Sequence, residues 1–184
     1  GVFEVGMSKA GEIRNLSNLV KPDIGVITNI GEAHIENFDN LNGIAKAKSE
    51  IIENINVGGF VILNKNDRFY NYFSKIAKDR KIKVLSFGSN KKSDAYLIKN
   101  TKHKNYNLLR LRVLNNNIFL KIQGANSLTV LNILASLLVL SLLNLDLSKI
   151  KNLTNLFNFV EGRGKTYTIK RYKKKFNFLD ESYN

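Results

Sequence analysis

The sequence predicts an α/β fold: a mainly parallel β-sheet flanked by helices, with a small antiparallel β meander. Short apolar segments alternate with amphipathic ones over residues 1–87, as in consecutive β-α-β units. Three segments of alternating polarity follow between residues 94 and 122, which is typical of antiparallel strands. Hydrophobic residues make up 43% of the 184 positions, enough for a buried core.

The first half should contain strands and helices in alternation. The short apolar runs expected as strands, of the kind found in buried parallel sheets, are residues 2–5, 24–27, 60–63 and 83–87. Apolar residues at helical spacing predict helices over residues 11–20, 41–55 and 68–80. In the first of these helices the spacing predicts one buried face, made of Ile13, Leu16, Leu19 and Val20. Pro22 should end that helix.

The second half should begin with the meander, at residues 94–100, 107–113 and 118–122. The asparagines at 115–117 suit its turn, because Asn tolerates left-handed backbone conformations. Two further helices are expected, around residues 128–143 and 148–159. The last expected element is a hairpin of residues 166–172 and 176–180, with its turn at residues 173–175.

The apolar run at residues 128–147 has about the length of a membrane span. Asn132, Asn144 and Asp146 interrupt it, and a helix that is apolar on most faces is also typical of a protein core. We therefore expect a core helix and no membrane insertion, with an interfacial or partner-binding helix as an alternative.

The composition excludes several classes of protein. Without any Cys, the chain has neither a disulfide framework nor a Cys-based zinc site. The net charge of +14 raises the alternative of a nucleic-acid-binding module, which would need Lys and Arg clustered on one face beside aromatic residues. Only residues 170–175 form such a dense run, so we expect no nucleic-acid partner.

Polar residues at the ends of the expected strands are the first candidates for chemistry, because ligands of open α/β sheets bind there. Glu4 lies near the end of the first strand, and Asn29 and His34 follow the second. A carboxylate and an imidazole from neighbouring strand ends can bind a metal ion. The alternative is that Glu4 and His34 are ordinary surface residues.

A lysine and an arginine are further candidates. Lys46 and Lys48 lie about 200° apart around a helix, so at most one of them can face the site. A lysine with a lowered pKa becomes nucleophilic and can add carbon dioxide to give an anionic carbamate; the alternative is a solvated lysine. Arg163, between two glycines, can approach a phosphate closely or simply face solvent in a turn. No G-x-x-x-x-G-K-[ST] phosphate loop occurs in the chain.

Four segments, in order, resemble the Mur ligase family. They are Glu4-Val5-Gly6-Met7 with Gly11-Glu12-Ile13, residues 28–36 (TNIGEAHIE), residues 47–51 (AKSEI) and residues 180–184 (DESYN). Gly11-Glu12-Ile13 and residues 180–184 most resemble the branch of the family that adds D-alanyl-D-alanine. The resemblance covers nearly the whole chain and implies the central ATP-binding domain of the family, with its P-loop-NTPase-like fold.

The resemblance implies an ATP-dependent amide ligase of peptidoglycan precursor synthesis. Such an enzyme phosphorylates a carboxylate of UDP-MurNAc-tripeptide, and D-alanyl-D-alanine then attacks the acyl phosphate. The implied cofactors are ATP and Mg²⁺, the implied location is cytoplasmic, and we expect a monomer. Another Mur-type or a folylpolyglutamate-type ligase remains an alternative.

The resemblance also implies roles for single residues. Glu4 and His34 match the magnesium-ligand positions, and Lys48 matches the lysine that is carbamylated and helps to hold magnesium. Asn29 belongs to the same strand-end motif as His34 and is assigned to cofactor binding. Arg163 matches the residue that contacts the ATP phosphates.

The nucleotide contacts are less sharply defined. Asp180, or its neighbour Glu181, matches the acidic position near the ribose. The adenine-side motif of the family is matched only in part. Residues 124–126 resemble the start of the motif, and residues 132–135 resemble its end. We assign the contact to Asn132 rather than Asn126, the alternative being a buried helix Asn with a structural hydrogen bond.

The expected domain organisation follows from these assignments. Residues 1–175 correspond to the central domain, truncated so that its phosphate loop would lie upstream of Gly1, and residues 176–184 begin the junction to a C-terminal domain. Both ends of the chain fall in expected strands, and no signal peptide is visible. We therefore expect a fragment of a longer enzyme that is inactive by itself.

Overall fold

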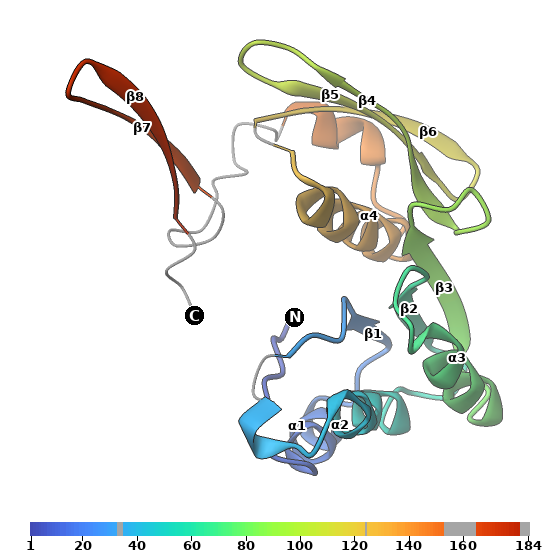
Figure 1. Cartoon of the computed structure of the whole chain (residues 1–184). Coiled ribbons are helices and arrows are strands. Elements are labelled where there is room, and N and C mark those ends of the chain that lie inside the picture. The colour runs from blue at the N-terminus through green and yellow to red at the C-terminus, as the bar shows by residue number, and fades with distance from the viewer. Residues whose placement is uncertain (33–34, 124, 153–164, 181–184) are drawn as a thin grey trace.

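The computed structural model describes residues 1–32, 35–123, 125–152 and 165–180. At its centre is a six-stranded sheet with the strand order β1-β2-β3-β4-β5-β6. Helices flank this sheet, and a separate two-stranded hairpin lies apart from it (Figure 1). The α/β class predicted from the sequence is confirmed.

The first four strands run parallel to one another. They are β1 (Ile24–Ile27), β2 (Phe60–Asn64), β3 (Lys83–Gly88) and β4 (Ala95–Lys102). The connections contain the helices α2 (Leu41–Glu53) and α3 (Tyr70–Asp79), with a short 3₁₀ helix, η1 (Ile35–Asn37), before α2. α1 (Glu12–Val20) precedes β1.

Alternation along β2 explains how helices come to cover both faces of the sheet. Val61 and Leu63 belong to a core cluster that also contains residues of α2 and α3, such as Ala45 and Phe73. Ile62, between them, belongs to a different cluster on the other face. All three β2 residues are fully buried, as expected for a parallel strand covered on both sides.

The meander is part of the same sheet and does not lie beside it. β4 pairs in parallel with β3 at two positions, Phe87 with Ala95 and Gly88 with Tyr96. β5 (Asn107–Val113) and β6 (Asn116–Ile122) then continue the sheet antiparallel. The left-handed residue of their turn is Leu114, at φ 51°, one position before the asparagines that the sequence suggested.

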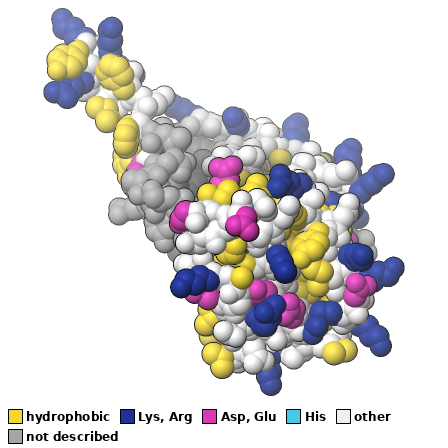
Figure 2. Space-filling view, turned by 60° about the horizontal axis from the view of Figure 1, so that its bottom comes forward, with side chains coloured by type: hydrophobic (Ala, Val, Ile, Leu, Met, Phe, Trp, Pro, Cys, Tyr) yellow, Lys and Arg dark blue, Asp and Glu magenta, His cyan; other side chains and the backbone are white. Residues whose placement is uncertain are grey.

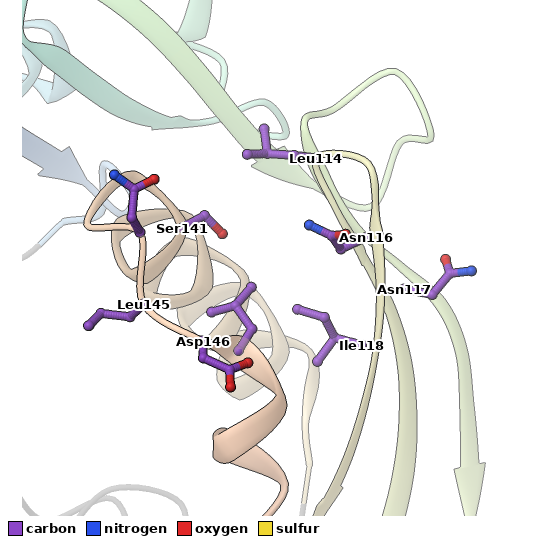
Figure 3. A pocket seen from close by; sticks show the side chains of 9 residues that line it. Leu114, Asn116, Asn117, Ile118, Ser141, Leu145 and Asp146 are labelled. Carbon is purple, nitrogen blue, oxygen red and sulfur yellow. The ribbon is translucent and has the colours of Figure 1, made fainter.

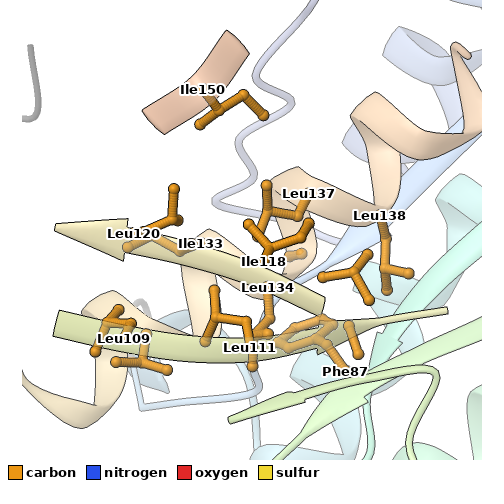
Figure 4. Close-up of a cluster of buried hydrophobic side chains, with 14 of the residues drawn as sticks. Phe87, Leu109, Leu111, Ile118, Leu120, Ile133, Leu134, Leu137, Leu138 and Ile150 are labelled. Carbon is orange, nitrogen blue, oxygen red and sulfur yellow. The ribbon is translucent and has the colours of Figure 1, made fainter. Parts of the chain in front are cut away.

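The helix α4 (Ser127–Leu142) covers the face of the sheet opposite α2 and α3. Its apolar residues pack on the strands in the largest core cluster (Figure 4), which includes Phe87, Leu109, Leu111, Leu134 and Leu138. α4 is therefore a core helix, as predicted. In the described part of the chain, no helix is both long and apolar enough to cross a membrane.

The predicted buried face of α1 is largely wrong. Ile13 is buried, but Leu19 is 81% exposed and Leu16 is 45% exposed, whereas Ser17 is buried. The rotation of the helix follows its polar contacts with α2, because the Asn54 amide donates to the Ser17 hydroxyl over 2.8 Å.

Residues 2–5 do not form the predicted strand. Val2 is 98% and Phe3 65% exposed, while Met7 is buried. A strand is held by hydrogen bonds to a neighbouring strand, and no described residue pairs with residues 2–5. Apolar composition alone does not make a strand, and the pairing that a strand requires is not present among the described residues.

The C-terminal part is described in two pieces. The short 3₁₀ helix η2 (Leu147–Asn152) begins where the second helix was expected, and residues 153–164 lie outside the described residues. β7 (Lys165–Arg171) and β8 (Lys174–Asp180) form the predicted hairpin. Its turn is at Tyr172 and Lys173, which have positive φ values of 52° and 61°.

Candidate functional site

The candidate site lies where β1 and β2 end. These strands are parallel neighbours, with Ile27 opposite Leu63, so the loops that follow them leave the sheet at the same edge. Two hydrogen bonds join the loops. The Asn64 side chain donates to the Thr28 carbonyl over 3.0 Å, and the Ile30 amide donates to the Asp67 carboxylate over 2.7 Å.

Lys48 on α2 reaches this pair of loops. Its Nζ donates a hydrogen bond of 3.0 Å to the carbonyl of Asn29, and the residue is half-buried. Lys46 is exposed, so only one of the two lysines is directed to the strand ends, as the helical spacing predicted. The structure thereby brings together two predicted site residues, Asn29 and Lys48.

The environment of Lys48 shifts its titration toward the neutral amine. Burial lowers the pKa of the Lys48 amine below its ordinary value of 10.5, and the nearby Asp67 carboxylate partly opposes this effect. The neutral amine carries the lone pair that reacts with carbon dioxide, so desolvation increases the reactive fraction.

A small hydrophobic cluster holds the segments that carry the candidates. Its buried members are Met7, Ile13, Ile44 and Ala47, and the partly buried residues packed on it include Val5 and Ile30. The cluster thus contains an immediate neighbour of each of Glu4, Asn29 and Lys48. Alternation along the chain directs Val5 into the cluster and leaves Glu4 exposed, so Glu4 can meet a ligand.

Buried Glu50, on α2, fixes the start of the helix that follows the Glu4 segment. Its carboxylate accepts from the amides of Gly11, over 2.8 and 3.1 Å, and Arg14, over 3.0 Å. Gly11 is the N-cap residue of α1 and Arg14 lies in its first turn, where N–H groups lack partners within the helix. Gly11 has a φ of 89°, a conformation that favours glycine.

The donor groups suit a hard cation such as Mg²⁺, which prefers oxygen ligands. Glu4 offers a carboxylate, whereas Lys48 offers oxygens only when its amine is carbamylated. His34 lies outside the described residues. Within the residues that the structure describes, no group of three or more His, Cys, Asp or Glu gathers into a metal site, so a metal centre here needs the modified lysine or His34.

Among the described residues, the predicted nucleotide contact Asn132 is not brought to Lys48. Asn132 lies on α4, on the opposite face of the sheet from α2. Because its side chain is exposed, the alternative of a buried helix Asn is wrong. Asn126 caps α4, its side chain accepting from the Thr129 amide over 2.7 Å. Asp180 ends β8 opposite Lys165 and is half-buried, while Arg163 and Glu181 lie outside the described residues.

A cavity lies elsewhere in the described part of the chain. A space of about 530 Å³ lies between the β5–β6 turn and the C-terminal end of α4, with Asn116, Asn117, Ser141 and Asp146 in its lining (Figure 3). None of the predicted site residues lines it. The candidate site is at the strand ends because a half-buried lysine and two hydrogen-bonded loops are found there.

Sequence reasoning missed Asp67 and Glu50. Asp67 follows the end of β2, so the same strand-end rule that selected Asn29 could have selected it. Glu50 lies three residues after Ala47 and therefore on the apolar face of α2. A charged residue on such a face signals a buried polar contact.

Comparison with known proteins identifies the family. The family model of the Mur ligase middle domain matches residues 1–140. The UDP-N-acetylmuramoyl-tripeptide–D-alanyl-D-alanine ligase of Rickettsia prowazekii is 42% identical over 98 residues, which are 53% of this chain and 22% of that enzyme.

Solved structures agree with this match. MurF from Acinetobacter baumannii superposes with a TM-score of 0.84 at 27% identity, covering 100% of this chain and 39% of that one. MurF from Thermotoga maritima, in complex with ADP, gives a TM-score of 0.79 at 25% identity, over 98% of this chain and 40% of that one. The chain thus spans about two fifths or less of these relatives. With the family model matching three quarters of its residues, the chain belongs to the Mur ligase family.

Proposed function

We propose that the chain is the middle part of an ATP-dependent ligase that joins D-alanyl-D-alanine to UDP-MurNAc-tripeptide. The observation that carries this proposal is the half-buried Lys48 amine at the ends of β1 and β2, held by the Asn29 carbonyl at 3.0 Å. In the Mur ligase family the matching lysine is the carbamylated one. The similarity to D-alanyl-D-alanine ligases from other bacteria supports this choice of substrates.

The reaction couples two transfers. The γ-phosphoryl group of ATP passes to a carboxylate of the tripeptide, giving an acyl phosphate and ADP. The amine of D-alanyl-D-alanine then attacks the acyl carbon, the amide bond forms, and inorganic phosphate leaves. Bound Mg²⁺ would neutralise the charge that accumulates on the phosphate oxygens during transfer.

The side chains of this chain would prepare the site for that reaction. The neutral Lys48 amine bonds to carbon dioxide and releases one proton, which converts the uncharged amine into an anionic carbamate. Together with Glu4 and His34, the carbamate would hold Mg²⁺, and Asn29 would stay fixed beside it.

The remaining proposed contacts belong to the nucleotide. Arg163 would bind the ATP phosphates, Asp180 or Glu181 the ribose, and Asn132 the adenine side, since Asn126 is used as a helix cap. The Thermotoga maritima relative was solved with ADP, which supports a nucleotide site in this fold. Residues 1–175 would be the middle domain and residues 176–184 the start of the junction to the next. A cytoplasmic, monomeric parent enzyme completes the proposal.

An acceptor assay with the full-length parent enzyme tests the proposal. We expect ATP-dependent, Mg²⁺-dependent ligation of D-alanyl-D-alanine to UDP-MurNAc-tripeptide, measured by release of ADP and by the mass of the product. Single amino acids with the shorter precursors test the other Mur-type reactions, and glutamate with a folate tests a folylpolyglutamate-type ligase. Turnover with one of those pairs and none with D-alanyl-D-alanine would refute the assignment.

A further inference from the structure

Asp67 connects two segments that are far apart in the sequence. Its Oδ2 accepts a hydrogen bond of 2.7 Å from the amide of Ile30, and its Oδ1 accepts one of 2.8 Å from the amide of Phe69. Two backbone donors therefore meet one carboxylate. Asp can accept at both oxygens, whereas Asn has one acceptor oxygen and would present an NH₂ group to the other donor.

The bond to Ile30 acts directly on the site. Ile30 adjoins Asn29, whose carbonyl accepts from the Lys48 amine. On the other side of the same loop, the Asn64 side chain holds the Thr28 carbonyl at 3.0 Å. The loop at residues 28–30 is thus fixed at both ends by the residues that follow or end β2.

A simple capping role does not account for this arrangement. The Oδ1 bond to Phe69 is a local contact two residues along the chain, as is common for Asp before a helix. The Oδ2 bond spans 37 positions and reaches a loop of another strand. The Ile30 side chain also packs on two core clusters, the one that contains Val61 and Phe73 and the one that contains Met7. Both the backbone and the side chain of Ile30 are therefore held in place.

We propose that Asp67 is a positioning residue for the ligase reaction: through the Ile30 amide it fixes the Asn29 carbonyl, and through that carbonyl the Lys48 side chain. This inference rests on the proposed function. Asp67 touches neither substrate nor nucleotide in this proposal. Its charge raises the pKa of Lys48, and its hydrogen bond to Ile30 fixes the loop.

Two substitutions in the full-length parent enzyme separate positioning from capping. Asp67→Ser keeps a hydroxyl acceptor suited to capping the turn before α3 but is too short to reach Ile30. Asp67→Asn keeps the size of the side chain but cannot accept both bonds. Asp79→Asn is the matched control, since it removes the same charge from an exposed residue at the end of α3.

We expect kcat to fall about ten- to hundredfold in both Asp67 variants, as it does when other residues that orient ligands are replaced. The affinity for Mn²⁺, which serves as a spectroscopic probe of the metal site, should fall by about the same factor. The KM values for the two peptide substrates should stay within about twofold. Hydrogen exchange at the Ile30 amide should accelerate in both variants. The control should match the wild type in all three measurements.

Wild-type kcat, Mn²⁺ affinity and Ile30 exchange in Asp67→Ser would overturn the inference. Equal losses in thermal stability and activity, with unchanged Mn²⁺ affinity in the folded fraction, would also overturn it in favour of a purely structural role. A wild-type parent that does not ligate D-alanyl-D-alanine would refute the proposed function instead. The Mn²⁺ titration and the exchange at Ile30 would then still decide the role of Asp67.

Discussion

Two opposing effects act on the pKa of Lys48. Burial lowers the pKa and the carboxylate of Asp67 raises it, and the effect of burial is the larger. Burial penalises the charged amine because a cation loses its hydration in the protein. The Asn29 carbonyl accepts a hydrogen bond from the amine but carries no full charge to offset that cost. A lysine in this environment is suited to react as a neutral amine.

The lowered pKa of Lys48 leads to a prediction about stability. In the unfolded chain the amine titrates near its ordinary value of 10.5, and in the folded protein it titrates lower. Between these two pKa values the unfolded state binds more protons, so the free energy of unfolding should rise with pH. The penalty on the charged amine is present in full below the folded pKa.

Denaturant unfolding of the wild type and of Lys48→Met, from pH 7 to pH 10.5, measures this contribution. We expect the rise with pH to be smaller in Lys48→Met. The exposed Lys46→Met is the control and should behave like the wild type. An equal rise in the wild type and in Lys48→Met would show that burial does not shift this pKa.

Among the helices, the contact of α1 with α2 combines a buried and an exposed carboxylate. Glu50 is 4% exposed and accepts the backbone bonds of Gly11 and Arg14. Glu53 is more exposed and makes a two-pronged ion pair with the Arg14 guanidinium, over 2.7 and 3.1 Å. Arg14 holds the pKa of Glu53 below its ordinary value, chiefly through this hydrogen bond.

The two carboxylates should differ in their effect on stability. Glu50→Ala leaves the partly buried amides of Gly11 and Arg14 without their acceptor, so we expect a loss of about 2 kcal/mol in the free energy of unfolding. Glu53→Ala should cost less than about 1 kcal/mol, because solvent screens the ion pair. Urea unfolding of both variants at pH 7 gives the comparison, and a larger loss for Glu53→Ala would contradict it.

The site follows from how the elements pack. The cluster of Met7, Ile13, Ile44 and Ala47 joins the Glu4 segment, α1 and α2. Spacing along α2 could predict that at most one of Lys46 and Lys48 is directed inward, and the resemblance to the Mur ligase family selected Lys48. The spacing could not predict the bond from Asp67 to Ile30, because this depends on the register of β1 against β2, which a single sequence does not specify.

At the scale of the whole molecule, the order of strands and helices was predictable because hydrophobic periodicity determines it locally. The exceptions are elements whose secondary structure or buried face depends on contacts with another element. Residues 2–5 have the composition of a strand without a pairing partner among the described residues. α1 rotates to meet polar groups of α2 and leaves Leu19 exposed.

The chain carries a net charge of +14. Figure 2 shows Lys and Arg spread over the visible face with Asp and Glu among them. Such a distribution makes the surrounding potential positive and favours anionic substrates in general. It does not by itself select nucleic acid, for which a basic stripe with interleaved aromatic residues would be required.

The 184 residues contain no phosphate loop of the G-x-x-x-x-G-K-[ST] type. We therefore predict that they do not ligate D-alanyl-D-alanine to UDP-MurNAc-tripeptide on their own. ADP release and product mass, measured beside the full-length parent as the positive control, test this. Turnover by the 184 residues alone would contradict the prediction.

Chemical rescue of Lys48→Ala in the full-length parent enzyme tests the central claim most directly. The substitution removes the amine that would become the carbamate, so ATP-dependent ligation should fall to background, while Lys46→Ala should retain activity. Formate or acetate should restore part of the activity in Lys48→Ala, because a small carboxylate can occupy the space and supply the missing oxygen ligands. Full activity in Lys48→Ala without added acid would contradict the account.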